Sequence, residues 1–340
     1  MRCAYLFFIL MLSGLLAAPA PLQAAEGEAP YVDHPDYDAF VQEVGEQFDI
    51  PAAELEPIFQ QAFRQQKILD AISRPAEGKD WSEYRPIFLT EERISGGVDF
   101  WNKHARTLAR AEAELGVDAE IIVAIIGVET YYGRITGSWR VIDALSTLAF
   151  DYPPRQTFFR SELRHFMQLV REENIDPLSV QGSYAGAMGG GQFMPSSYRQ
   201  YAVDFDTDGQ RDLWNSWPDA IGSVANYLSR HGWEHGAVIA VPAGAGESAP
   251  LQEQGMKVYK ASRLRQQGLV FSDVVDNGEE VRLVALQQDD GLHYWIGREN
   301  FRVITRYNRS PLYAMAVMDL GRVIEARRQQ AILDKAASQR

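Results

Sequence analysis

The feature that most constrains this chain is a run of eight consecutive apolar residues, 121–128, within the segment from Ala119 to Tyr132. A helix that is apolar on every side is stable only where other elements surround it. We therefore expect residues 119–132 to form a helix in the middle of a core. The chain has 340 residues, of which 46% are hydrophobic, and this is enough to build such a core.

Glu129 directly follows the apolar run. Isoleucines lie seven, four and three residues before it, so its side chain projects from an apolar face of the helix. Burial there disfavours a charged carboxylate and raises its pKa. A carboxyl group that stays protonated near neutral pH is suited to act as the general acid in glycosidic cleavage. The alternative is a structural glutamate paired with Arg134 or Arg140.

Helical spacing of apolar residues dominates the chain up to residue 235. Residues 81–88 are rich in aromatic side chains and are expected to be irregular. From about Gly236, short β-prone runs next to Asn-Gly and Asp-Gly turn signals predict a small, mostly β insert. The other expected helices begin at Tyr37 and Pro51 and cover 96–115, 142–148, 158–171, 219–230 and 313–337, and the expected strands are 238–241, 281–286 and 292–296.

The first 25 residues have the order of a secretory signal peptide. Arg2 precedes an apolar run over 4–12, and small residues at 24–25 suit a cleavage site. This run is shorter than the ~20 residues that a bilayer span requires, which disfavours the alternative of an anchoring helix. Residues 26–36 are expected to form a flexible lead. We therefore predict a protein exported to the periplasm, with no membrane span.

The single cysteine, Cys3, precedes the apolar run, whereas the cysteine of a bacterial lipoprotein follows it. The mature chain is thus expected to have no lipid anchor, no disulfide and no thiol nucleophile. Its net charge changes from −13 to −14, because the signal contains Arg2 and no acidic residue. An acidic chain without a basic cluster is not suited to bind nucleic acid.

A glycine-rich segment, 182–195, is a second candidate site. It lacks the Gly-Lys-Ser/Thr of a phosphate-binding loop, and no strand leads into it as a dinucleotide fingerprint requires. Ser183 stands in Gly-Ser-x-x-Gly, so the spacing of a hydrolase nucleophile elbow is absent. Small residues instead allow a bulky ligand to approach the backbone, with Ser183 and Gln192 as hydrogen-bonding groups.

An acidic segment that begins at Asp204 matches the calcium loop of an EF-hand. Carboxylates stand at its positions 1, 3, 5 and 9, and Gly209 stands at position 6. Position 12 is Asn215, and the next carboxylate is Asp219, so a bound ion requires a lengthened loop. The pattern favours a structural calcium ion over a solvated acidic turn.

Several motifs in the same order resemble the membrane-bound lytic murein transglycosylase B family. They are Gly-Val-Glu-Thr-x-x-Gly-Arg at 127–134, the run from Ser183 to Tyr198, the acidic loop leading into 219–227, and Tyr-Asn-x-Ser-x-x-Tyr-Ala at 307–314. The resemblance extends over roughly residues 35 to 325. Long motifs in register are more specific than any one of them alone.

The resemblance implies a mainly α (α+β) fold with a lysozyme-like core, a helical domain built from both chain ends and a small β domain. The implied boundaries are 37–110 for the helical domain, completed by 313–340, then 111–235 for the catalytic core with its EF-hand-like loop at 204–219, 236–305 for the β domain, and 306–340 for a groove segment and C-terminal helix. The absence of a lipidation cysteine implies a soluble member.

The resemblance also implies the residues of the site. Glu129 matches the family's catalytic acid/base. Residues that match glycan-groove positions are Ser183, Gln192, Phe193, Tyr227, Tyr307, Asn308 and Tyr313, together with Tyr84 and Arg155. Those that match the calcium ligands are Asp204, Asp206, Asp208, Gln210 through its backbone carbonyl, and Asp219. No cofactor is implied for the chemistry, and the implied partners are peptidoglycan glycan strands, with other cell-wall enzymes as further candidates.

The implied reaction breaks the β-1,4 bond between N-acetylmuramic acid and N-acetylglucosamine with one glutamate. The substrate's acetamido group would stabilise the cation, and its own 6-hydroxyl would attack in place of water, since an intramolecular nucleophile has a high effective concentration. Alternatives are a lysozyme-type hydrolase, for which Asp143, Asp151 or Glu162 could supply a second carboxylate, and a non-catalytic peptidoglycan-binding scaffold.

Overall fold

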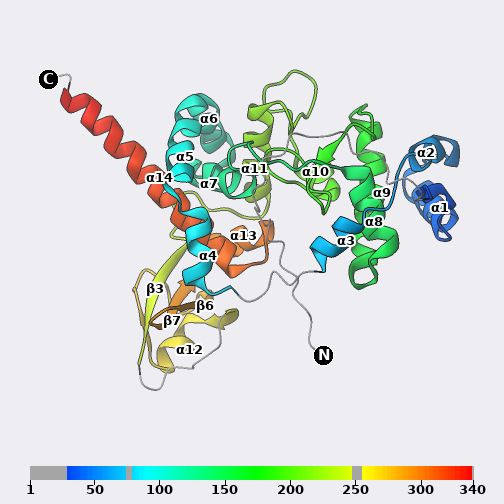
Figure 1. Ribbon diagram of the computed structural model, residues 1–340. Coiled ribbons are helices and arrows are strands. Elements are labelled where there is room, and N and C mark those ends of the chain that lie inside the picture. The colour runs from blue at the N-terminus through cyan, green and yellow to red at the C-terminus, as the bar shows by residue number, and fades with distance from the viewer. Residues whose placement is uncertain (1–28, 74–78, 247–254, 339–340) are drawn as a thin grey trace. The chain divides into compact units, whose positions relative to one another are not determined.

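The computed structural model describes residues 29–73, 79–246 and 255–338 (Figure 1). The predicted signal peptide, residues 1–25, lies outside these ranges. The described chain divides into two compact units: unit 1 contains residues 79–132, 224–246 and 255–338, and unit 2 contains residues 29–73 and 133–223. The units divide the chain at other positions than the predicted domains, whose boundaries remain predictions.

Unit 1 combines helices with a small antiparallel sheet. Its helices are α4 (Trp81–Phe88), α5 (Glu91–Lys103), α6 (Ala105–Leu115), α7 (Ala119–Thr130), α12 (Ala261–Gln266), α13 (Glu299–Tyr307) and α14 (Pro311–Ser338). Its strands are β3 (Ala240–Ala245), β4 (Gly255–Lys260), β5 (Leu269–Phe271), β6 (Glu280–Gln288) and β7 (Gly291–Gly297).

Unit 2 is mostly helical. Its helices are α1 (Tyr37–Phe48), α2 (Ala52–Phe59), α3 (Gln66–Ile72), α8 (Val141–Asp151), α9 (Gln156–Glu172) and α10 (Pro195–Tyr201), with short 3-10 helices η1 (Tyr31–Asp33) and η2 (Pro153–Arg155). Strand β1 (Trp139–Arg140) pairs antiparallel with β2 (Gln181–Gly182). Helix α11 (Trp217–Arg230) begins in unit 2 and ends in unit 1.

Helix α7 is the core helix of unit 1, which confirms the prediction from the apolar run. Every residue of α7 except Glu120 is buried. Helices α5, α6 and α14 contact it (Figure 1). Gly321 allows α14 to come close, because a Cβ at that position would lie 3.1 Å from the carbonyl oxygen of Glu120. The segment that follows α7 is therefore anchored on a packed core.

The sheet of unit 1 has the strand order β4-β6-β7-β3-β5, with antiparallel neighbours. Val281 and Leu283 of β6 belong to an apolar cluster that includes Leu264 of α12. Val284 and Leu286 are also buried, and α4 contacts β6. Because both faces of β6 are covered, its sequence is almost continuously apolar rather than alternating.

Residues 81–88 were expected to be irregular, and that expectation is wrong: they form α4. The amide of Asp80 donates to Glu83 Oε2 at 3.2 Å at the start of the helix. Trp81, Tyr84 and Phe88 follow helical spacing and are all buried. Pro86 lies inside the helix, yet the packing of these three aromatic side chains outweighs its helix-breaking tendency.

Other elements differ in extent from the expected ones. The helix expected over 96–115 is two helices, because the backbone of His104 departs from helical geometry at φ −108° and ψ 20°. The insert expected to be mostly β also contains α12 and α13. Part of the expected flexible lead is packed, since Tyr31 is buried and its hydroxyl donates to Asp151 at 2.6 Å.

The mainly α (α+β) composition is confirmed by these elements. No helix within residues 29–73, 79–246 and 255–338 combines the length and the apolar character that crossing a membrane requires.

Candidate active site

Glu129 lies in the last turn of α7, where the chain reverses sharply. Tyr131 and Tyr132 have positive φ angles of 52° and 59°. The ring of Tyr132 folds back against Gly127, where a Cβ would lie 2.5 Å from the Tyr132 hydroxyl. A glycine at this position therefore allows the reversal that ends α7 at Thr130, one residue after the glutamate.

The carboxyl group of Glu129 is buried and accepts a hydrogen bond within unit 1. Only 9% of the residue is exposed, and Tyr313 in the first turn of α14 donates a hydrogen bond to Glu129 Oε1 at 2.6 Å. Burial raises the pKa of Glu129 from 4.5 to about 7, and the hydrogen bond from Tyr313 opposes this rise. At neutral pH the carboxyl group is thus divided between its acid and base forms.

Tyr313 is fixed by the start of its own helix. Pro311 opens α14, and the amide of Tyr313 donates to Ser310 Oγ at 3.2 Å. Ser310 is itself buried, and its amide donates to Asn308 Oδ1 at 3.2 Å. The predicted residue Asn308 therefore shapes the turn between α13 and α14 that presents Tyr313 to Glu129.

Further predicted tyrosines gather around this glutamate within unit 1. Burial raises the pKa of Tyr84, Tyr307 and Tyr313, and the charge of Glu129 raises each of them further. These hydroxyl groups consequently stay protonated as donors. The hydroxyl of Tyr227 donates to the carbonyl oxygen of Arg306 at 2.6 Å, and its ring lies edge-on to that of Tyr307 at 4.8 Å.

Arg93 is a buried residue near Glu129 that the sequence analysis did not identify. It is 3% exposed, and its Nε donates to the carbonyl oxygen of Gly127 at 3.1 Å. Its guanidinium lies 4.6 Å from the centre of the Tyr131 ring. Arg93 thus donates to one carbonyl group in the last turn of α7 and, through Nη1, to the carbonyl oxygen of Ile87 in α4. An arginine near the start of an amphipathic helix ordinarily points to solvent, so its sequence position carried no signal.

Ser183 and Gln192 lie in the glycine-rich loop of unit 2. Ser183 Oγ accepts the amides of Ala185 at 3.3 Å and Ala187 at 3.0 Å, so its hydroxyl shapes the loop. Gln192 has φ 52°, and its Nε2 donates to the carbonyl oxygens of Thr136 and Gly189, each at 3.1 Å. Its Oε1 is buried and has no hydrogen-bond partner among the described residues. A ligand that brings a donor would satisfy this oxygen.

The two remaining groove candidates are placed differently. Phe193 is 2% exposed, and its backbone pairs with Met188, so its ring belongs to the packing beneath the loop. Arg155 is the last residue of η2, and its guanidinium lies over the Phe158 ring, 4.3 Å from the ring centre. Neither position tests the role that the resemblance implies for these residues.

The glycine-rich loop is bonded to the end of the acidic loop. The amide of Gly190 donates to the carbonyl oxygen of Leu213 at 2.8 Å. Gly189 has φ 70°, and a Cβ there would lie 2.5 Å from the same oxygen. This close approach requires glycine, and it makes the two loops one structural piece of unit 2.

The acidic loop brings carboxylates together as a cation site requires. Oxygens of Asp204, Asp206 and Asp219 all lie within 4.8 Å of one another. Asp219 is fully buried and accepts the amides of Phe205 at 2.7 Å and Asp212 at 2.9 Å. Carboxylate oxygens are the ligands that calcium prefers, so these clustered residues fit the ion.

The other two predicted ligands lie at the exposed side of this loop. Asp208 Oδ1 accepts the amide of Gln210 at 2.9 Å, and the amide of Asp208 donates to Asp204 Oδ1 at 3.1 Å. These bonds curl the loop around its acidic residues. Gln210 is exposed, which leaves its ligand role as a prediction.

The carboxylates considered as a second catalytic group have structural partners in unit 2. Asp143 forms an ion pair with Arg140 at 2.7 Å. The alternative that Arg140 pairs with Glu129 is therefore not favoured, because Arg140 already has this carboxylate partner. Asp151 accepts the Tyr31 hydroxyl at 2.6 Å. Glu162 accepts the amide and hydroxyl of Ser196 at 2.9 and 2.7 Å. Each of these carboxylates therefore already has a role in the packing.

Residues 33–322 match the model of the transglycosylase SLT domain family. The chain is also 42% identical over 311 residues to the membrane-bound lytic murein transglycosylase B of Escherichia coli (strain K12), in a match that covers 88% of this chain and 85% of that protein.

Solved structures of lytic transglycosylases are similar to the chain. Catenated SltB1 from Pseudomonas aeruginosa has a TM-score of 0.82 at 52% identity, covering 88% of this chain and 99% of that one. Escherichia coli Slt35 in complex with calcium has a TM-score of 0.81 at 42% identity, covering 88% and 96%. SltB3 from Pseudomonas aeruginosa in complex with NAG-anhNAM-pentapeptide has a TM-score of 0.73 at 30% identity, covering 85% and 78%. The chain has the lysozyme-like fold of these structures, as expected.

Proposed function

This chain belongs to the transglycosylase SLT domain family and is a lytic transglycosylase that acts on peptidoglycan, and from that premise we propose that it cleaves the β-1,4 bond between N-acetylmuramic acid and N-acetylglucosamine without consuming water. The products would carry 1,6-anhydro-N-acetylmuramic acid ends. The names of the relatives as transglycosylases support this product, as does the NAG-anhNAM-pentapeptide bound by SltB3.

The observation that carries this proposal is the burial of the Glu129 carboxyl group beside the Tyr313 hydroxyl. A pKa of about 7 lets the same carboxyl group donate a proton to the leaving oxygen and then accept one from the attacking hydroxyl at neutral pH. Tyr313 orients the carboxyl group through its hydrogen bond. The substrate supplies its own nucleophile, the 6-hydroxyl of N-acetylmuramic acid, so a single glutamate suffices.

Each unit contains its own candidate glycan-binding residues. In unit 1 the candidates are Tyr84, Tyr227, Tyr307, Asn308 and Tyr313, and in unit 2 they are Arg155, Ser183, Gln192 and Phe193. Gln192 has the strongest physical support, because its buried Oε1 requires a donor that a sugar hydroxyl or acetamido N–H can provide.

Calcium would serve the structure rather than the chemistry. The Slt35 structure contains calcium, and the carboxylates of Asp204, Asp206 and Asp219 converge in this chain. We assign Asp208 and the Gln210 carbonyl as further ligands from the sequence pattern. An ion there would neutralise these carboxylates and stabilise the loop that is bonded to the glycine-rich segment.

The site of action would be the periplasm. Peptidoglycan lies outside the cytoplasmic membrane, and residues 1–25 have the order of a cleaved signal peptide. Fractionation of the host cell tests this proposal, and retention of the uncleaved chain in the cytoplasm would contradict it.

Digestion of purified sacculi in heavy-oxygen water tests the reaction. We expect muropeptides that are lighter by one water than hydrolysis products and that carry no heavy oxygen. Glu129→Gln is the control, because it keeps the shape of the side chain but cannot deliver a proton, and it should release nothing. Labelled reducing ends would identify a lysozyme-type hydrolase instead. Binding to sacculi without release by the wild-type chain would identify a scaffold.

A further inference from the structure

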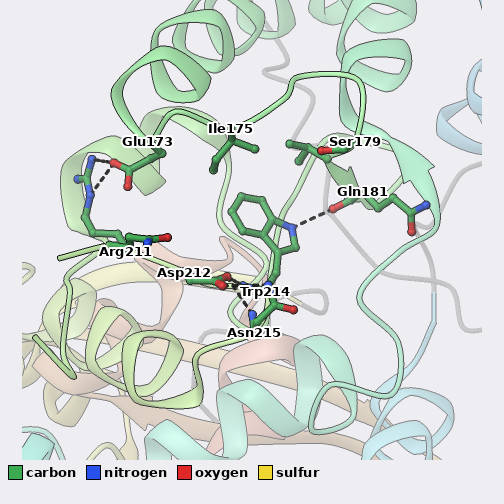
Figure 2. A pocket seen from close by; sticks show the side chains of 10 residues that line it. Glu173, Ile175, Ser179, Gln181, Arg211, Asp212, Trp214 and Asn215 are labelled. Atoms are coloured by element: carbon green, nitrogen blue, oxygen red, sulfur yellow. Dashed lines mark hydrogen bonds and ion pairs between the residues drawn. The ribbon is translucent and has the colours of Figure 1, made fainter. Parts of the chain in front are cut away.

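Unit 2 contains a pocket of about 340 Å³ that none of the predicted glycan-binding residues line (Figure 2). Its walls come from the segment after α9 and from residues 210–215 of the acidic loop, which include the predicted calcium ligand Gln210. Ligand pockets in proteins typically measure roughly 300–1,000 Å³ and combine an apolar surface with a few polar groups. This pocket therefore has the size for a small ligand.

Trp214 supplies a fixed aromatic surface. Figure 2 shows its indole ring in the middle of the pocket, with Ile175 and Ser179 on one side and Asp212 and Asn215 on the other. The indole Nε1 donates to the carbonyl oxygen of Gln181 at 3.1 Å, and the ring packs against Tyr198 at 5.5 Å between centres. These two contacts fix the orientation of the indole before a ligand arrives. The residue is only partly buried, so part of the ring remains accessible to a ligand.

The charged groups of the pocket are already paired. Arg211 Nε donates to Glu173 Oε1 at 2.9 Å. Asp212 accepts the amides of Trp214 and Asn215 and the side-chain amide of Asn215, each at 2.9 Å. A charged ligand would have to compete with these internal partners, so the pocket favours a neutral one.

Hydrogen-bonding capacity for such a ligand remains at the rim. Asn215 is exposed, and its side-chain oxygen is an acceptor that the bond to Asp212 does not use. The Ser179 hydroxyl donates to the carbonyl oxygen of Asp176 at 2.8 Å, which leaves its lone pairs as acceptors. The pocket thus presents an aromatic ring to one face of a ligand and neutral acceptors to its edge.

We propose that the Trp214 pocket binds a neutral N-acetylated amino sugar of the glycan strand, as a site additional to the one that contains Glu129. This pocket proposal depends on the proposed function in one respect only, which is that the sugar comes from a peptidoglycan strand. A pyranose ring has C–H groups on its faces and hydroxyl and acetamido donors at its edge. These match the partly buried indole and the acceptors of Asn215 and Ser179.

Fluorine NMR of the chain labelled with 5-fluorotryptophan reports on this pocket directly. The Glu129→Gln chain is used so that no substrate is cleaved, and Trp214→Phe assigns the Trp214 resonance. Titration with N-acetylglucosamine should move this resonance saturably. Ser179→Phe, which fills the pocket, should abolish the shift, and Ser272→Phe at an exposed serine elsewhere should leave it unchanged.

Asn215→Ala gives a second measurement that does not depend on filling the pocket. Loss of one hydrogen bond should weaken binding about fivefold. The proposal is overturned if the Trp214 resonance stays still, if only a free stem peptide moves it, or if the shift persists in Ser179→Phe. Release of muropeptides by the chain with intact Glu129 is measured separately. If muropeptides are released but the Trp214 resonance does not move, only the pocket proposal is refuted. If the resonance moves but no muropeptides are released, only the proposed function is refuted.

Discussion

Replacing Glu129 by glutamine should stabilise the protein, and by an amount that depends on pH. Below the ordinary pKa of 4.5, Glu129 is protonated in both the folded and the unfolded state, so ionisation costs the fold nothing. Above about 7 it is charged in both states, and the folded protein then contains a buried charge. The raised pKa therefore destabilises the wild-type fold progressively as pH rises through this window.

The size of the effect follows from the two pKa values. The difference between 4.5 and about 7 corresponds to about 3 kcal/mol of unfolding free energy, at about 1.4 kcal/mol per tenfold change in proton affinity. Glutamine is neutral at every pH. Near pH 5 part of this cost is already present, so Glu129→Gln should gain about 2–3 kcal/mol more over the wild type near pH 8.5 than near pH 5.

Urea unfolding followed by circular dichroism at both pH values measures this difference, and equal slopes against urea ensure that the same transition is compared. Glu114→Gln is the matched control, because the side chain of Glu114 is 57% exposed. It should change the unfolding free energy equally at the two pH values. An equally pH-independent effect of Glu129→Gln would show that Glu129 is not a buried group with a raised pKa, and the acid/base argument would lose its physical basis.

Other perturbations have equally specific outcomes. Tyr313→Phe removes the hydrogen bond that lowers the pKa of Glu129, so the alkaline limb of the rate of muropeptide release should move to higher pH; an unmoved limb would contradict this. Calcium at one hundred times its dissociation constant should stabilise the wild-type chain by about 2.7 kcal/mol in thermal unfolding. Asp204→Asn should lose that gain, whereas the exposed Asp273→Asn should keep it. Gly127→Ala places a Cβ against the Tyr132 hydroxyl and should destabilise the chain by about 1–3 kcal/mol in urea unfolding, with Gly278→Ala, which meets no atom within 4 Å, as the neutral control.

Local sequence patterns predicted the features of this protein that are determined within a single helix or a single loop. The apolar run predicted the buried helix α7, and the position of Glu129 at its end predicted a raised pKa, which burial produces. The parity of the aspartates predicted a convergent group, and Asp204, Asp206 and Asp219 do converge. Each of these inferences needs only the geometry of one helix or one loop.

What the patterns missed depends on contacts between distant segments. Residues 81–88 were expected to be irregular, because the burial of the α4 aromatic residues depends on contacts such as the one between α4 and β6 that no local pattern shows. The glycan-binding role that the resemblance implies for Tyr313 stays a prediction, and no local pattern indicated its hydrogen bond to Glu129, 184 positions earlier in the chain. Arg93 bonds to the backbone of another helix and leaves no trace in its own sequence neighbourhood.

Gln192 has a consequence for which strands the protein accepts. Its side-chain Nε2 donates to the carbonyl oxygens of Thr136 and Gly189, and these bonds fix the orientation of the amide. In this orientation Oε1 has no donor among the described residues. The unliganded protein already bears the desolvation cost of that oxygen, about 1–3 kcal/mol. A sugar that brings a donor relieves this cost, and one whose donor is capped by an acyl group leaves it in place and adds bulk. Gln192 would then discriminate between strands, because a strand whose donor reaches Oε1 gains this free energy of about 1–3 kcal/mol on binding and a chemically modified strand without that donor does not.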